Sequence, residues 1–202
     1  MRWHRFDCAD LPTMPWKNGG GVTREVVCQP PGANMEDFDW RVSIAAVASD
    51  GPFSSFSGID RVITLLEGGG MHLASDDSTI DHRLDTPLQP FAFPGEARVH
   101  ARLLAGACED FNVMARRATC RAEVRILRHA SEVSAPQGLL LATQGVWSVQ
   151  PPHEDAHALP VQLGLWWQAD ATNPDTSWQL HPQTPGASLL AVTIHPLSAT
   201  PS

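Results

Sequence analysis

Short runs of alternating or β-branched apolar residues, each followed by turn residues, restrict this chain to a β fold. The clearest runs lie at 40–47, 61–67, 71–74, 111–115 and 189–195. The 15 glycines and 17 prolines are spread between such runs along the 202 residues and do not collect in one linker. Sustained helical periodicity is scarce. We therefore predict an all-β, mainly antiparallel protein in which helices are few and short.

A weak internal repeat suggests that one β domain is present twice. When Gly69 is aligned with Gly145, LLEGGGMHL (65–73) matches the pattern of LATQGVWSV (141–149), and 111–115 matches 190–194 at a similar spacing. Two similar barrels would explain both matches, although two apolar strands around a glycine turn also recur by chance in β proteins.

The charge balance excludes several classes of partner. With 14 Lys and Arg against 22 Asp and Glu, the net charge of −8 argues against sequence-independent binding to nucleic acid or to an anionic membrane. No apolar run approaches the 18 residues of a membrane span, and the N-terminal MRWHRFDCADL lacks a secretory signal. We predict a cytoplasmic protein with small-molecule or protein partners.

The sequence offers no convincing metal or redox centre. The motif H-E-x-x-H occurs at 153–157, but prolines at 151, 152 and 160 leave room for at most about two helical turns. His72, His82 and His100 lie in no H-x-H pair, and Cys8, Cys28, Cys108 and Cys120 form no C-x-x-C pair. We predict reduced cysteines without a function, no bound metal and no cofactor.

The segment GPFSSFSGIDRVITLLEG (51–68) resembles the metal-binding strands of cupins, which are small double-stranded β-helix barrels. The cupin motif G-x5-H-x-H-x3,4-E-x6-G holds a metal through two histidines and one glutamate. Counted back from Gly68, Arg61 stands at the glutamate position, and no histidine occurs in 54–57. Arg98 similarly replaces the remaining histidine of the second cupin motif. Cations in place of metal ligands predict a site for a small anion.

Four longer blocks resemble the HutD/Ves family: PWKNGGGVTREV (15–26), WRVSIAAVASDGPFSSFSGIDRVITLLEGGG (40–70), FAFPGE (91–96) and EDFNVMARR (109–117). This resemblance is close over roughly residues 1–120 and loose beyond them. It implies a bicupin, with one barrel in 1–120, a second in 121–202, and no recognised catalytic metal. It also implies a cytoplasmic bacterial protein that restrains histidine utilisation by binding an intermediate such as urocanate or formylglutamate.

Strand alternation indicates which side chains share a surface. Arg61 lies on one face with Ile63 and Leu65, so its guanidinium needs an acceptor, either a ligand carboxylate or a structural ion pair with Asp110 or Glu25. Asp110 and Asn112 also share a face, which lines either the cavity or the solvent. Asn112 is a ligand candidate because an amide both donates and accepts hydrogen bonds.

The KNGGG segment adds further candidates. Asn18-Gly19 is a hairpin signal, and three consecutive glycines allow a ligand to approach the backbone closely. Lys17, Asn18 and Arg24 are therefore candidate pocket residues. The alternative is a turn whose side chains attach the first strand to the barrel mouth.

Three classes of function fit these features. The leading hypothesis is a non-catalytic binder of small carboxylates that regulates histidine and urocanate catabolism. The second is a metal-independent cupin isomerase or lyase with Glu25 or Asp110 as base. The third is a protein-interaction module with a vestigial cavity. Cupins often pair through barrel edges, so we also expect a homodimer, with Trp147, Trp166, Trp167 and Trp178 in the core or in a subunit contact.

Overall fold

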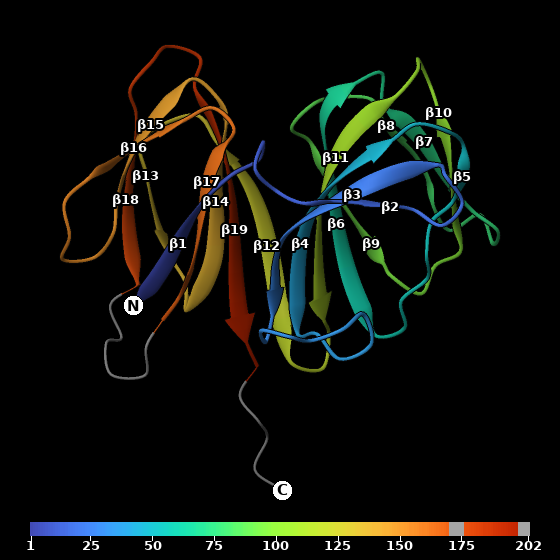
Figure 1. Cartoon of the computed structure of the whole chain (residues 1–202), viewed down its shortest axis with the longest axis horizontal. Coiled ribbons are helices and arrows are strands. Elements are labelled where there is room, and N and C mark those ends of the chain that lie inside the picture. Colours follow the sequence, from blue (N-terminus) through green and yellow to red (C-terminus); the bar gives the residue numbers. More distant parts are fainter. Residues whose placement is uncertain (170–175, 198–202) are drawn as a thin grey trace, which may run out of the picture. The chain divides into compact units, whose positions relative to one another are not determined.

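The computed structural model describes residues 1–169 and 176–197, and within these ranges the chain forms strands and loops and no helix (Figure 1). The all-β prediction is confirmed. No segment within the described ranges is a helix long and apolar enough to cross a membrane.

The chain forms two compact units, which we call the N-terminal unit (12–120) and the C-terminal unit (1–11 with 121–202). The family resemblance assigns 1–11 to the first barrel, whereas these residues lie with the C-terminal unit. The reason is strand pairing: β1 (Arg2–Asp7) runs antiparallel to β17 (Leu163–Gln168), with Arg2 opposite Gln168 and Asp7 opposite Leu163. A pairing between segments so distant in sequence has no local signal.

The N-terminal unit contains two sheets. Its six-stranded sheet has the order β2-β3-β4-β11-β6-β9, and its four-stranded sheet has the order β5-β10-β7-β8. Their bounds are β2 Thr13–Pro15, β3 Gly21–Gln29, β4 Trp40–Val47, β5 Gly51–Pro52, β6 Ile59–Gly68, β7 Met71–Ser75, β8 Asp81–Leu84, β9 Pro90–Pro94, β10 Val99–Leu103 and β11 Cys108–Arg116.

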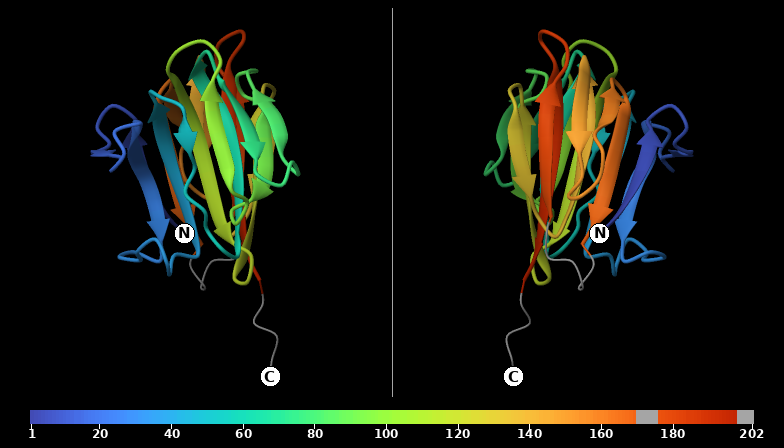
Figure 2. Two further views of the ribbon diagram at one scale, coloured as in Figure 1. Left: turned by 90° about the vertical axis from the view of Figure 1, so that its right-hand side faces the viewer. Right: turned by 90° about the vertical axis from the view of Figure 1, so that its left-hand side faces the viewer.

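The C-terminal unit also contains two sheets. A five-stranded sheet has the order β1-β17-β14-β19-β12, and a four-stranded sheet has the order β13-β18-β15-β16. The remaining bounds are β12 Cys120–Leu127, β13 Ser131–Ser134, β14 Gln137–Gln144, β15 Val146–Gln150, β16 His157–Pro160, β18 Ser177–Pro182 and β19 Ser188–Pro196. Figure 2 shows the strands in two further views, in which most of them run up and down.

The strand order repeats between the units. The order β5-β10-β7-β8 corresponds to β13-β18-β15-β16, and β4-β11-β6-β9 corresponds to β12-β19-β14-β17. Gly69 and Gly145, which align in the sequence repeat, lie in the equivalent turns after β6 and β14. The sequence repeat therefore reflects two copies of one β topology.

The inner face of the six-stranded sheet can be read from its register. Arg61, Ile63 and Leu65 on β6 lie opposite Met114, Asn112 and Asp110 on β11. Cross-strand partners point to the same side of a sheet. Ile63 and Leu65 pack in one core with Met71 and Leu73 of the four-stranded sheet, and all four are fully buried. The face that carries Arg61, Asn112 and Asp110 therefore points into the space between the two sheets.

Candidate functional site

Arg61 is a buried cation with weak protein partners. Its side chain is 7% exposed. Its Nε and Nη2 both donate to Oδ1 of Asn112 at 3.3 Å, and its Nη1 donates to the carbonyl oxygen of Ser54 at 3.4 Å. A guanidinium has five N–H groups. One N–H on Nη1 and one on Nη2 therefore donate to no acceptor among the described residues, and both remain available to a ligand carboxylate.

Phenylalanine rings surround this guanidinium. Its Cζ lies 5.2 Å from the ring centroid of Phe53, 5.9 Å from that of Phe56 and 5.0 Å from that of Phe93. The pKa of Arg61 is lowered to about 10, mainly by burial; Asp110 opposes the shift and Arg41 adds to it. Arg61 thus stays protonated at neutral pH, and cation–π attraction supplies part of its stabilisation.

The loop that supplies Ser54 is fixed by its backbone. The N–H of Phe53 donates to the carbonyl oxygen of Val99 at 2.8 Å, and the N–H of Phe56 donates to that of Gly95 at 2.7 Å. These bonds hold the Ser54 carbonyl and two of the phenylalanine rings over Arg61. The same loop occupies the positions at which a cupin would carry its paired histidines.

Neither of the carboxylates considered as structural partners of Arg61 takes that role. Arg61 forms no ion pair with any carboxylate of the described residues. Glu25 instead accepts a hydrogen bond from Nε of Arg41 at 2.7 Å. Among the described residues, the positive charge of Arg61 is therefore offset only by the longer-range electrostatic attraction of Asp110.

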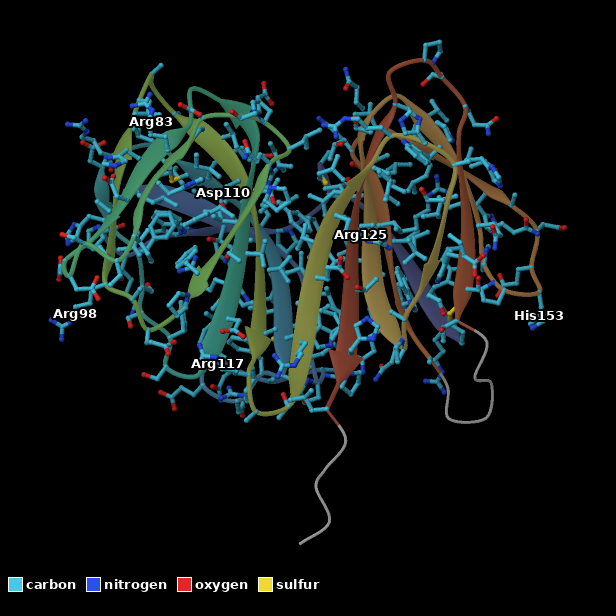
Figure 3. All side chains as sticks on the ribbon, turned by 180° about the vertical axis from the view of Figure 1, so that it is seen from behind. Arg83, Arg98, Asp110, Arg117, Arg125 and His153 are labelled. Carbon is cyan, nitrogen blue, oxygen red and sulfur yellow. The ribbon has the colours of Figure 1, made fainter. Side chains whose placement is uncertain are left out.

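Asp110 is a buried carboxyl on the same face. It is 2% exposed, and no described group donates a hydrogen bond to it. Figure 3 shows its side chain inside the N-terminal unit. Its pKa is raised to about 7, mainly by burial; the positive charge of Arg61 opposes the rise and the negative charge of Glu109 adds to it. Near neutral pH the acid and the carboxylate of Asp110 are therefore both populated.

Arg41 is a second buried cation on this face that our sequence-based candidates did not include. It is 6% exposed and lies opposite Met114, which in turn lies opposite Arg61. Its Nη1 donates to Oγ of Ser43 at 3.3 Å. The signal was present, because alternation in WRVSIAAV places Arg41 and Ser43 on one face of an otherwise apolar strand.

Lys17 and Asn18 lie in the exposed hairpin between β2 and β3. Oδ1 of Asn18 accepts a hydrogen bond from the N–H of Gly20 at 3.0 Å, and Gly19 has a φ of +71°. The indole of the neighbouring Trp16 donates to Oγ1 of Thr23 at 2.7 Å. No described contact joins Lys17 or Asn18 to Arg61. These contacts fit a turn that attaches the hairpin to the barrel.

Replacing Asn18 with alanine should lower the free energy of unfolding by about 1 kcal/mol, because the Gly20 N–H loses its acceptor. Ligand affinity should not change. Chemical denaturation and calorimetric titration measure the two quantities. A tenfold loss of affinity in the folded variant would instead make Asn18 a ligand contact.

Arg24 and Arg98 point away from Arg61. Arg24 lies opposite Ile44, on the reverse face of the six-stranded sheet, and pairs with Glu109. Arg98 is exposed between β9 and β10, and Figure 3 shows it on the outer surface. Of the sequence-predicted site residues, the structure thus brings together Arg61, Asn112 and Asp110, and it does not bring Lys17, Asn18, Arg24 or Arg98 to them.

The described residues offer no ready metal-ligand set. No group of three His, Cys, Asp or Glu side chains gathers within the described ranges. The H-E-x-x-H motif lies in a turn and a strand, since His153 has a φ of +62° and His157 begins β16. The His157 ring packs 5.0 Å from Trp3. These two histidines therefore do not stand on one face of a helix.

Known proteins with the same fold include several close relatives. In solved structures, a conserved protein of unknown function from Pseudomonas aeruginosa PAO1 aligns with a TM-score of 0.84 at 32% identity, covering 96% of this chain and all of that one. HutD from Pseudomonas fluorescens SBW25, in a formate condition, aligns with a TM-score of 0.82 at 29% identity, covering 98% and 100%. A cupin 2 conserved barrel domain protein from Leptotrichia buccalis, at 8% identity and a TM-score of 0.61, shares the fold alone. The predicted cupin-type β fold is thereby confirmed.

Sequence comparison agrees with the structural likeness. Protein Ves from Escherichia fergusonii is 45% identical over 146 residues, which are 71% of this chain and 74% of that protein. The model of the HutD family matches residues 8–188. This chain therefore belongs to the HutD family.

Proposed function

We propose that the N-terminal unit binds a small carboxylate at Arg61 and that this binding regulates histidine utilisation in the cytoplasm. The observation that carries the proposal is the buried guanidinium of Arg61, which has two N–H groups without a described acceptor and no carboxylate in an ion pair. A buried unpaired charge is costly. A carboxylate that accepts from both groups would offset that cost.

The expected affinity is in the micromolar range. Each charge-assisted hydrogen bond contributes roughly 1.5 to 3 kcal/mol, whereas micromolar binding requires about 8 kcal/mol. The remainder must come from apolar contact with rings such as Phe53 and Phe93 at about 25 cal/mol per Å², after ordering costs are subtracted. A small planar acid can satisfy both requirements.

Urocanate and formylglutamate are the first ligands to test. Both are small acids, and the relative from Pseudomonas fluorescens is named HutD. Binding such an intermediate would let the protein restrain the pathway that produces it, through depletion of the acid or through contact with a pathway protein. A second copy of the chain is a further partner that we propose on the basis of cupin pairing.

Urocanate or formylglutamate at 100 times its Kd should raise the free energy of unfolding by about 2.7 kcal/mol. Thermal melting with each acid measures the effect. The matched control is the primary amide of the same acid, which lacks the charge that Arg61 recognises and should produce a much smaller shift. Equal shifts with acid and amide, or no shift with either acid, would contradict the proposal.

Asp110 favours one alternative function, a metal-independent isomerase or lyase. A buried carboxyl with a pKa of about 7 and no described hydrogen-bond donor has the properties of a general base near neutral pH. Chromatography of the acids after long incubation distinguishes the two functions. Turnover that is lost in Asp110→Asn would favour the enzyme, and recovery of unchanged acid would favour the binder.

A further inference from the structure

We propose that Asp110 sorts the carboxylates that bind at Arg61 by the chemical group at their far end. The inference rests on the proposed function and names the class of ligand: monocarboxylates that carry a nitrogen donor, such as an imidazole N–H, at the end remote from the carboxylate. A second anionic group at that end, as in formylglutamate, would be disfavoured, so of the two acids proposed above the inference selects urocanate.

The placement of three side chains along one face supports this inference. Arg61 is hydrogen-bonded to Asn112, and Asp110 is two residues from Asn112 on the same strand. Residues two apart on a strand point to the same side and are about 6 to 7 Å apart. A ligand whose carboxylate sits at Arg61 and which extends along β11 therefore brings its far end to Asp110.

The protein supplies no partner for Asp110 on the adjoining strands. The residues directly opposite it are Ala45 on β4 and Leu65 on β6. The facing sheet contributes the buried apolar residues Met71 and Leu73. A buried polar group that no protein group satisfies is costly, so a donor on the ligand is the group that fits this position.

None of the other titratable groups described around Asp110 supplies the hydrogen-bond donor that its carboxylate lacks. On its own strand, burial keeps the Cys108 thiol neutral by raising its pKa to about 11, and Glu109 on the reverse face is paired with Arg24. Arg41 on β4 is bound to Glu25 on β3. Arg61 attracts Asp110 through space but donates its bonds to Asn112 and Ser54.

Because of these surroundings, a ligand with an N–H donor at its far end should bind more tightly than a ligand with a second carboxylate there. An N–H donor or an imidazolium forms a charge-assisted bond with the Asp110 carboxylate. A second carboxylate at the same place would put two like charges side by side, and one of them would have to take up a proton. The difference should grow as the pH rises, because the ionised fraction of Asp110 increases.

The test compares three acids by calorimetric titration at pH 8. The acids are urocanate, (E)-3-(3-furyl)acrylate, which has a similar shape but no ring N–H, and glutarate, which has a second carboxylate. Urocanate should bind the wild-type protein at least about tenfold more tightly than either of the others, since one charge-assisted bond is worth that factor.

Asp110→Asn should reduce the preference for urocanate over the furan to less than about threefold and should strengthen glutarate binding by about tenfold. The matched control is Glu109→Gln, which neutralises the next residue on the reverse face of the same strand. It removes a charge that raises the pKa of Asp110, but at pH 8 Asp110 is mostly ionised with or without that charge, so each of the three affinities should change by less than about threefold.

The outcomes separate this inference from the function on which it rests. If none of these three acids binds the wild-type protein and formylglutamate does not bind either, both are overturned. If urocanate binds only when Arg61 is present, but the furan binds equally well and Asp110→Asn changes nothing, the proposed function stands and the role of Asp110 is overturned.

Discussion

Replacing Arg61 with methionine should weaken carboxylate binding by about 100-fold or more and leave the folded protein about as stable as the wild type. Two charge-assisted hydrogen bonds of roughly 1.5 to 3 kcal/mol each are lost with the guanidinium, and 1.4 kcal/mol is a tenfold change in Kd. Stability should change little, because methionine packs well beside Phe53 and Phe93 and removes a buried cation that lacks an ion pair.

Calorimetric titration and chemical denaturation of the same preparation measure both quantities. Arg98→Met is the matched control, since Arg98 is exposed, and it should retain the wild-type Kd. Arg61→Lys keeps the charge but not the paired donors, so it should bind weakly. Wild-type affinity in the folded methionine variant would show that Arg61 is not the anchor.

Much of the fold was predictable because its signals are local. The run at 40–47 coincides with β4, and the run at 61–67 lies within β6 (Ile59–Gly68). Alternation and turn residues report a strand wherever it lies in the chain. They carry no information on partners far away in sequence, which is why the pairing of β1 with β17 could not be predicted.

The internal repeat was faint in sequence for a related reason. A barrel strand requires an alternating pattern and a turn of suitable geometry, and many residues satisfy both requirements. The repeated strand order therefore persists although few residues match between the two units. Gly69 and Gly145 are among the matches, at turns where the chain passes between sheets of the same unit.

The site was predictable in part, and the limit is the register between strands. Alternation alone placed Arg61 with Ile63 and Leu65, but it left open whether Asp110 and Asn112 face the cavity or the solvent. The pairing of Asn112 with Ile63 shows that both face the space between the two sheets. Arg24 illustrates the same limit, because alternation separates it from Glu25 without showing which of the two points inward.

Arg41 and Arg61 show how the same residue type can fill two roles on one face. Arg41 is held by Glu25 and Ser43, so its charge is neutralised within the protein. Arg61 is held by neutral oxygens and faces Asp110 only at a distance. The charge that a ligand meets is therefore set mainly by Arg61 and Asp110, and it varies with the protonation of Asp110 near pH 7.

The stability gained by Asp110→Asn should be about 4 kcal/mol greater at pH 8 than at pH 4. In the folded protein burial raises the pKa of Asp110 from 3.8 to about 7, and each unit corresponds to 1.36 kcal/mol. The wild-type protein loses this stability between about pH 4 and pH 7, where the unfolded chain is ionised and the folded chain keeps its proton. Denaturation of both proteins across this range gives the difference. Asp77→Asn is a control in which the pH dependence of stability has the opposite sign, because hydrogen bonds from Ser75 and Thr79 lower the pKa of Asp77 to about 2. A pH-independent difference for Asp110→Asn would mean that folding does not raise the pKa of Asp110.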